Sequence, residues 1–305
     1  MAVAILDFGT NTFNLLIAEQ KFGGFEILHF GKEGVKLGRG GIQDGIIAPD
    51  AIERGVKAIQ RHFDTIHMYP VEEVYAFATA AIRSARNGKG FVSLIHEKFG
   101  LQVQVIDGDR EAELIYKGVK QAVPLTEANA MIIDIGGGSI EFIICNRDGI
   151  LWKHSFELGM ARILEIFKLS DPVSEEDIKS LETYYEQELN LLFKQVKIFK
   201  PKILIGASGS FDTFRSLLAN KKESKESQEQ GVKISMNDYI MIHKELVRST
   251  TEERIKMPGM ELVRVEMIVP ATIFVSFVIR SCKMEALFQS NFALKEGVMA
   301  EMFGF

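Results

Sequence analysis

The apolar residues of this chain follow two periods, which together predict alternating strands and helices. Short apolar segments at residues 2–6, 13–19 and 25–30 have the length of β-strands and predict an antiparallel meander. The segment that begins at Pro49 instead has apolar residues three or four positions apart, which is typical of one face of a helix. Those residues are Ile52, Val56, Ile59, Phe63 and Ile66.

The first half of the chain continues this alternation as far as Pro124. Residues 74–78 and 103–106 predict two further strands, because each is a short apolar segment between polar residues. Helices are predicted at 91–99 and 111–123 from the spacing of their apolar residues.

A second half follows and repeats the order. Residues 131–135 predict a strand, and Ser174 with the three acidic residues after it predicts a capped helix start. That helix is predicted to run to about Phe199, and residues 202–205 predict a strand before another glycine-rich turn. The charged segment 221–230 is predicted to be a solvated loop.

Two segments of the chain repeat one another at an offset of 134 − 7 = 127 residues. Residues 7–18 read DFGTNTFNLLIA and residues 134–145 read DIGGGSIEFIIC. In both segments a predicted strand is followed by an acidic residue, a glycine-rich turn with small hydroxyl side chains and a second predicted strand. Plain β-hairpins also choose Gly, Asn and Asp, but a repeat that keeps the acid and the hydroxyl in register favours a shared function.

Such a pair of turns has the chemistry of a phosphate site with a metal. A glycine turn exposes backbone N–H groups to an anion and lets the backbone approach closely. An acidic residue beside the turn would repel a phosphate unless a divalent cation lies between them. Two βββαβα-like halves, residues 1–123 and 124–305, would place the turns at equivalent ends of their sheets, so we expect a ligand in the cleft between them.

Composition and charge narrow the class further. The 305 residues are 47% hydrophobic and 25% charged, with a formal net charge of −5. A negative net charge argues against a surface that collects nucleic acid, although a local site can still bind a polyanion. The longest apolar segment, 268–279, is too short to span a bilayer and predicts a buried helix. Without a signal-peptide pattern, we expect a cytoplasmic protein with no membrane partner.

Five separated motifs carry a resemblance to one family. They are residues 7–12 (DFGTNT), 78–87 (ATAAIRSARN), 107–119 (DGDREAELIYKGV), 133–141 (IDIGGGSIE) and 206–210 (GASGS). On these motifs the chain resembles the exopolyphosphatase/guanosine pentaphosphate phosphohydrolase (Ppx/GppA) family over its full length. The resemblance implies an α/β fold of two ribonuclease-H-like domains, as in the actin, hsp70 and sugar kinase superfamily, facing an interdomain cleft.

The activity implied by the resemblance is hydrolysis of a terminal phosphoryl group, assisted by Mg²⁺ or another divalent cation. The substrate and partner would be inorganic polyphosphate or guanosine pentaphosphate, between which the sequence does not choose. The chain resembles the short, two-domain members of the family, for which a homodimer is a family-level expectation.

The resemblance assigns catalytic roles to Glu111, Arg83 and Asp134. Glu111 would orient and deprotonate the attacking water, and the planar guanidinium of Arg83 suits phosphate oxygens. From the residues alone, Glu111 could equally be a surface acid favoured at a helix start, and Glu113 fits that description as well. Only the register of the motif selects Glu111.

The predicted metal ligands are Asp134, Glu141 and Asp7. Glu141 lies across the second hairpin from Asp134, and Mg²⁺ usually takes one or two carboxylates and keeps several waters. The alternative is that Asp134 only accepts hydrogen bonds from its turn, and the same alternative applies to Asp7.

Small and hydroxyl-bearing residues of three turns form the predicted phosphate cradle. They are Thr10, Asn11, Thr12, Gly137, Gly138, Ser139, Gly209 and Ser210. Turn chemistry alone would select the same residue types. Ile140 stands where the family often has threonine, so we expect one hydroxyl fewer in the second turn, and Arg264 is a further candidate cation.

Two other functions stay open. A kinase or ATPase of the same superfamily would need an adenosine pocket, for which the turn at 206–209 is the candidate. A sensor would bind the alarmone or polyphosphate without turnover. The acids Glu111, Asp134 and Glu141 argue against a sensor, because a pure binder gains nothing from carboxylates that face phosphate.

Overall fold

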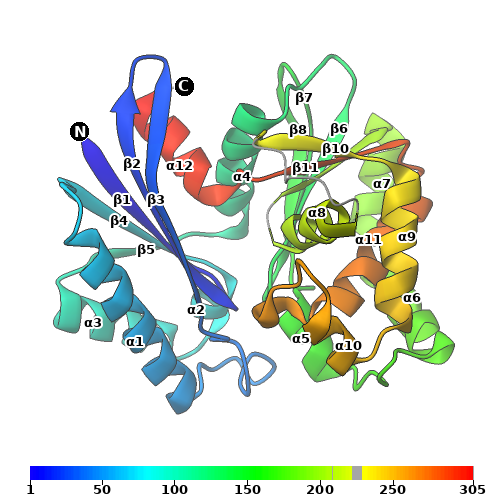
Figure 1. The fold of residues 1–305 in the computed structure, drawn as a ribbon, viewed down its shortest axis with the longest axis horizontal. Coiled ribbons are helices and arrows are strands. Elements are labelled where there is room, and N and C mark those ends of the chain that lie inside the picture. The colour runs from blue at the N-terminus through cyan, green and yellow to red at the C-terminus, as the bar shows by residue number, and fades with distance from the viewer. Residues whose placement is uncertain (208, 222–228, 305) are drawn as a thin grey trace.

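Two mixed β-sheets, one in each half of the chain, form the frame of the molecule (Figure 1). This computed structural model describes residues 1–207, 209–221 and 229–304. The first sheet has the strand order β3-β2-β1-β4-β5, in which β1, β2 and β3 form an antiparallel meander and β4 and β5 run parallel to β1. Its strands are β1 (Ala2–Phe8), β2 (Thr12–Lys21), β3 (Gly24–Gly34), β4 (Glu73–Ala78) and β5 (Val103–Val105). The helices of this half are α1 (Pro49–Ile66), α2 (Ala80–Ser84), α3 (Gly88–Phe99) and α4 (Gly108–Ala122).

The second sheet repeats this plan with an added edge strand, in the order β10-β11-β9-β6-β7-β8. Its strands are β6 (Ala130–Ile135), β7 (Ile140–Asn146), β8 (Gly149–Phe156), β9 (Ile203–Ala207), β10 (Gly231–Ile234) and β11 (Ala286–Ser290). The helices are α5 (Met160–Ile166), α6 (Glu175–Glu188), α7 (Asn190–Phe199), α8 (Ser210–Lys221), α9 (Met236–Arg248), α10 (Thr251–Lys256), the 3₁₀ helix η1 (Leu262–Arg264), α11 (Ile268–Cys282) and α12 (Leu294–Phe303). The two-part α/β architecture predicted from the sequence is therefore confirmed.

One predicted helix is wrong, because the segment from 175 to about 199 forms two helices. The break falls at Leu189, whose φ of −92° and ψ of 16° leave the α-helical region. Leu189 is fully buried in the core of the second half. Its packing there is a tertiary effect that helix periodicity does not show. The predicted charged loop falls mainly on residues 222–228, which lie outside the described residues.

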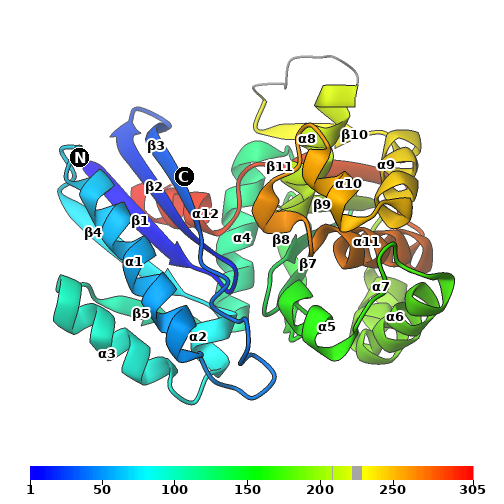
Figure 2. The ribbon, with the colours of Figure 1, turned by 60° about the horizontal axis from the view of Figure 1, so that its bottom comes forward.

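Helices α4 and α12 lie side by side between the two sheets (Figures 1 and 2). Helix α4 packs against β7 and β8 of the second sheet, and α12 packs against β1, β2 and β3 of the first. One apolar cluster joins all these elements, with Ile5 from β1, Ile132 from β6, Leu114 from α4 and Met299 from α12 among its members. The C-terminal helix thus packs with the N-terminal half. The division into two domains after residue 123 stays a prediction.

The outer faces of the sheets are covered by the other helices. Helices α1 and α3 cover the first sheet, and α6, α9 and α11 pack with the second. Residues 268–279 form most of α11 and are almost entirely buried, as the sequence predicts. Among the described residues, no helix combines the length and apolar character needed to cross a membrane.

Candidate active site

Two β-hairpins, β1–β2 and β6–β7, face each other across the cleft and bring the repeated motifs together. In each hairpin the acidic residue before the turn pairs with a polar residue on the outgoing strand, Asp7 with Asn14 and Asp134 with Glu141. Paired residues of an antiparallel ladder point to the same face of the sheet. The side chains of Asp134 and Glu141 therefore share one face, as predicted.

The glycines of the second turn are required by the closeness of the first turn. A Cβ at Gly137 would lie 2.2 Å from Nδ2 of Asn11, and a Cβ at Gly138 would lie 2.6 Å from Oγ1 of Thr10. A side chain at either position would displace the side chain of Asn11 or Thr10 from its place in the first turn. The two halves of the predicted cradle thus meet directly.

A single pocket gathers most of the residues predicted from the sequence. They are Asp7, Thr10, Asn11, Thr12, Glu111, Asp134, Gly137, Gly138, Ser139, Glu141 and Gly209, with Arg264 also in the lining. Ser210 lies next to the pocket at the start of α8, buried, and its hydroxyl has no hydrogen-bond partner among the described residues. Ile140 does not line the pocket, because its side chain packs in the core of the second half, and the loss of a hydroxyl relative to the family stays a prediction.

Glu111 and Arg83 form a close ion pair at the edge of this pocket. Asp107 caps α4 by accepting a hydrogen bond from the backbone N–H of Arg110 at 2.7 Å, which places Glu111 in the first turn of the helix. Nη1 of Arg83 donates to Oε2 of Glu111 at 2.8 Å and to the carbonyl of Ile106 at 3.0 Å. Burial and the nearby Glu141 raise the pKa of Glu111 well above its usual range, and Arg83 opposes that rise.

Three further carboxyl groups line the same pocket, of which Glu141 is buried and Asp7 and Asp134 are partly buried. Burial, followed by the charges of Glu141 and Asp7, raises the pKa of Asp134 well above its usual range. Burial also raises the pKa of Asp7, although Lys295 and the amide of Asn14 partly offset it. It raises the pKa of Glu141 too, against a 2.6 Å hydrogen bond from the Ser155 hydroxyl. Such a cluster is costly unless a cation compensates it.

Lys295 is a site residue that was not identified from the sequence. It stands in the first turn of α12, lines the pocket and is 5% exposed. Burial opposes its charge, but the carboxylates of Glu296 and Asp7 outweigh that effect, so the pKa of Lys295 is raised. A lysine in the first turn of an apolar helix is unusual, since that end of a helix disfavours cations, and this was the available signal.

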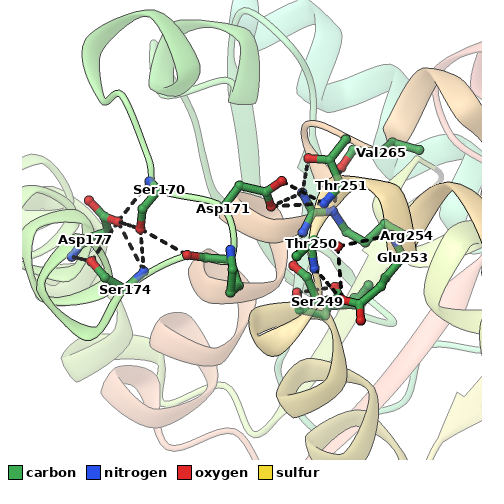
Figure 3. A network of polar contacts seen from close by, with 12 residues as sticks. Ser170, Asp171, Ser174, Asp177, Ser249, Thr250, Thr251, Glu253, Arg254 and Val265 are labelled. Atoms are coloured by element: carbon green, nitrogen blue, oxygen red, sulfur yellow. Dashed lines mark hydrogen bonds and ion pairs between the residues drawn. The ribbon is translucent and has the colours of Figure 1, made fainter.

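Arg264 reaches the pocket from a segment that a polar network holds in place (Figure 3). The guanidinium of the buried Arg254 donates to the carbonyl of Val265 at 3.1 Å, to the Oγ1 atom of Thr251 at 2.8 Å and to Asp171 at 3.2 Å. These bonds tie α10 and the segment before α6 to the residue that follows Arg264. The network therefore fixes the backbone from which Arg264 extends.

The pocket suits a divalent cation that shares its coordination with a phosphate. Among the described residues, no three His, Cys, Asp or Glu side chains are grouped to hold a metal by themselves. The donors present are buried and partly buried carboxylates, the hard oxygen ligands that Mg²⁺ prefers, and Mg²⁺ commonly takes only one or two of them. Asp7, Asp134 and Glu141 fit that pattern.

Known proteins resemble this chain over nearly its whole length. The guanosine-5'-triphosphate,3'-diphosphate pyrophosphatase of Pseudoalteromonas translucida is 28% identical over 98% of this chain, which spans 59% of that relative's length. An exopolyphosphatase structure from Cytophaga hutchinsonii has a TM-score of 0.97 at 36% identity, covering 100% of this chain and 98% of that one. A Ppx/GppA structure from Aquifex aeolicus has a TM-score of 0.81 at 25% identity, covering 100% and 98%.

A model described as the Ppx/GppA phosphatase family matches residues 16–304. That range begins within β2 and contains the second hairpin, the Arg83–Glu111 pair and the helix that carries Lys295. The chain belongs to the Ppx/GppA phosphatase family.

Proposed function

We propose that this protein is a phosphohydrolase that releases terminal orthophosphate from inorganic polyphosphate or guanosine pentaphosphate. The observation that carries the proposal is the buried carboxylate of Glu111, held by Arg83 beside a pocket built from two glycine turns. The names of the relatives from Pseudoalteromonas and Cytophaga support this class of substrate.

Glu111 acts as the general base. It takes a proton from a water molecule whose oxygen attacks the terminal phosphorus. The bond from that phosphorus to its bridging oxygen breaks, and the electron pair stays with the shortened substrate. Because burial raises the pKa of Glu111, its carboxylate is a stronger base than an exposed one.

The phosphate is positioned by the turns and by two cations. Backbone N–H groups of the turns at Thr10–Asn11 and Gly137–Gly138 bind its oxygens, and Arg264 and Lys295 bring positive charge to the same pocket. One or two of the carboxylates of Asp7, Asp134 and Glu141 would hold Mg²⁺, which when bound would neutralise charge on the phosphate oxygens. A cytoplasmic location and a homodimer stay predictions.

The test is phosphate release with Mg²⁺ from polyphosphate and from guanosine pentaphosphate, in the wild type and in Glu111→Gln. We expect loss of turnover by about 10²- to 10⁴-fold, the usual contribution of a general base. Glu113→Gln is the matched control, because Glu113 lies on the same helix but pairs with Lys153 and Arg110 outside the pocket. Equal activity of Glu111→Gln and the wild type would refute the role of Glu111.

The two alternatives give different results in the same assay. A kinase would transfer phosphate from ATP to a small sugar or acid and release no orthophosphate from polyphosphate. A sensor would bind guanosine pentaphosphate tightly without turnover in any divalent metal.

A further inference from the structure

A second pocket opens beside the first and is the larger of the two. Its cavity volume is about 380 Å³, compared with about 90 Å³ for the pocket at Glu111. It lies between the loop after β3, helix α5 with the segment that follows, and Met267. Asn11 lines both pockets, and its Nδ2 atom donates to the sulfur of Met267 at 2.8 Å. A substrate whose terminal phosphate lies at the first pocket can therefore extend past Asn11 into the second.

The second pocket has an apolar wall and a cationic rim. Leu164, Phe167, Leu169 and Met267 supply the apolar surface, and Lys36, Arg39 and Lys168 supply the cations. Apart from Met267, the apolar side chains are only partly buried, so they are accessible to a ligand. The lining is thus amphipathic, unlike the pocket at Glu111.

The acidic residues that line the second pocket already have hydrogen-bond partners. Glu165 accepts hydrogen bonds from the backbone N–H groups of Gly40 at 3.0 Å and Gln43 at 3.2 Å. Glu266 accepts from Nζ of Lys36 at 2.8 Å, and this hydrogen bond is the main reason that the pKa of Glu266 is lowered.

Two of the rim cations are not engaged in this way. Within the described part of the chain, the side chains of Arg39 and Lys168 make no ion pair or hydrogen bond, although Arg39 helps to lower the pKa of Glu266 from a longer distance. Both cations can therefore bind an anionic ligand.

The rim of the pocket is held in a fixed shape. Lys36 adopts a φ of 47°, which is costly for a residue with a side chain. Three contacts hold it there: its N–H donates to the carbonyl of Asn11 at 2.9 Å, its carbonyl accepts from Arg54 at 3.1 Å, and its ammonium pairs with Glu266. Strain that is kept in place in this way is typical of ligand sites.

We propose that this second pocket binds the nucleoside end of a nucleotide substrate whose terminal phosphate reacts at Glu111. A linear polyphosphate has no apolar part and would gain nothing from Phe167 or Leu164. A purine nucleotide combines a planar base, which stacks on an aromatic ring, with further phosphates for Arg39 and Lys168. The proposal rests on the phosphohydrolase function above and selects the nucleotide over polyphosphate as the substrate that this site fits.

The experiment compares guanosine pentaphosphate with tripolyphosphate, which has a terminal phosphate but no nucleoside. Steady-state phosphate release is measured with both for the wild type, Phe167→Ala and the double variant Arg39→Gln/Lys168→Gln. Base stacking on an aromatic side chain is worth about 1–3 kcal/mol, so Phe167→Ala should raise KM for the nucleotide roughly 5- to 150-fold. The KM for tripolyphosphate should change less than about twofold, since the first pocket is untouched. Phe22→Ala is the matched control, because Phe22 is a fully exposed phenylalanine in the β2–β3 turn.

If Phe167→Ala raises KM equally for the two substrates, or for neither, the proposal is overturned. If the wild type hydrolyses neither substrate, the proposed function fails. The second pocket is then tested by measuring the binding of guanosine tetraphosphate to the wild type and to Phe167→Ala by calorimetry. Binding that is at least fivefold weaker in Phe167→Ala supports the pocket. Equal binding, or no binding to the wild type, contradicts it.

Discussion

Asn14 occupies in the first hairpin the place that Glu141 occupies in the second. Asn14 donates from Nδ2 to Asp7 at 3.0 Å, so Asp7 faces a neutral partner, whereas Asp134 faces a second carboxyl group. Neighbouring like charges raise each other's pKa. The pair Asp134–Glu141 in the second hairpin is therefore costlier to bury than the pair Asp7–Asn14 in the first. The need for a compensating cation is therefore greatest at Asp134.

Replacing Asp134 by asparagine should stabilise the metal-free protein while weakening its response to Mg²⁺. The pKa of Asp134 is raised on folding, so its ionisation at neutral pH favours the unfolded chain, and this penalty fades as pH falls toward the ordinary Asp range. We expect the Tm of metal-free Asp134→Asn at pH 7 to rise by about 2–4 °C, which corresponds to roughly 1 kcal/mol. Thermal unfolding with and without Mg²⁺ measures both effects.

Asp148→Asn is the control for this measurement, because Asp148 is an exposed acid in the β7–β8 turn. It should change neither the Tm nor the Mg²⁺ response. A lower Tm for metal-free Asp134→Asn would show that Asp134 is a stabilising hydrogen-bond acceptor of its turn, the alternative raised from the sequence.

The pH dependence of turnover should report the Arg83–Glu111 pair. Glu111 must be ionised to accept a proton, and its raised pKa places the acid limb of the kcat/KM profile above the ordinary Glu value of about 4.3. Arg83 opposes that rise, so Arg83→Met should move the acid limb to still higher pH at a fixed Mg²⁺ concentration. A profile that moves to lower pH, or stays in place, would contradict this account of the pair.

At this scale the sequence identified the acids but not all the cations. The hairpin pattern of the second motif placed Asp134 and Glu141 on one face, because a local hairpin determines which residues pair. Lys295 reaches the same pocket only because α12 packs against the first sheet, a contact between the two ends of the chain. Local periodicity carries no information about such a contact.

The segment that carries Arg264 is held in position by one buried polar side chain, that of Arg254 (Figure 3). It is 5% exposed and donates to the carbonyls of Ser249 and Val265 as well as to side chains. The segment that carries Arg264 has only a three-residue 3₁₀ helix of its own, η1. Its position therefore depends on Arg254 more than on local structure.

Arg254→Lys should lower kcat/KM about tenfold, since lysine keeps the charge but cannot reproduce the fork of donors. The decisive readout is a double-mutant cycle with Arg264→Ala. If Arg254 acts by positioning Arg264, the Arg254→Lys substitution will have little further effect on kcat/KM in the Arg264→Ala background. Arg248→Lys, an exposed arginine at the end of α9, is the control. Additive losses would show that Arg254 serves stability alone.

The boundaries of helices agree with the prediction where a local capping signal sets them. Gly100 ends α3 in the left-handed region at a φ of 65°, and Ser174 caps α6 with Asp177 in a capping box. The break at Leu189 was not predicted because the buried side chain, and not a breaker residue, fixes it.

The whole molecule depends on the crossing of α4 and α12, because these helices connect the two sheets and carry Glu111 and Lys295. Two glycines allow this close approach. A Cβ at Gly297 would lie 1.8 Å from the carbonyl oxygen of Leu114, and a Cβ at Gly118 would lie 1.9 Å from that of Ala293. No repeat or motif predicted this crossing, since glycine within a helix is ordinarily only a local weakness.

Gly297→Ala should therefore destabilise the protein and impair catalysis together. Forcing a methyl group into this crossing should lower the free energy of unfolding by about 1–3 kcal/mol, the usual cost of overpacking. It should also lower kcat, because the shift of α12 moves Lys295 relative to Glu111. Gly90→Ala is the matched control, since Gly90 lies within α3 with nothing within 4 Å of its Cβ position, and it should gain about 0.5–1 kcal/mol from helix propensity. Denaturant unfolding and phosphate release measure the two effects. If Gly297→Ala were as stable as Gly90→Ala, the helices could separate without cost, and the crossing would not be what couples the two halves.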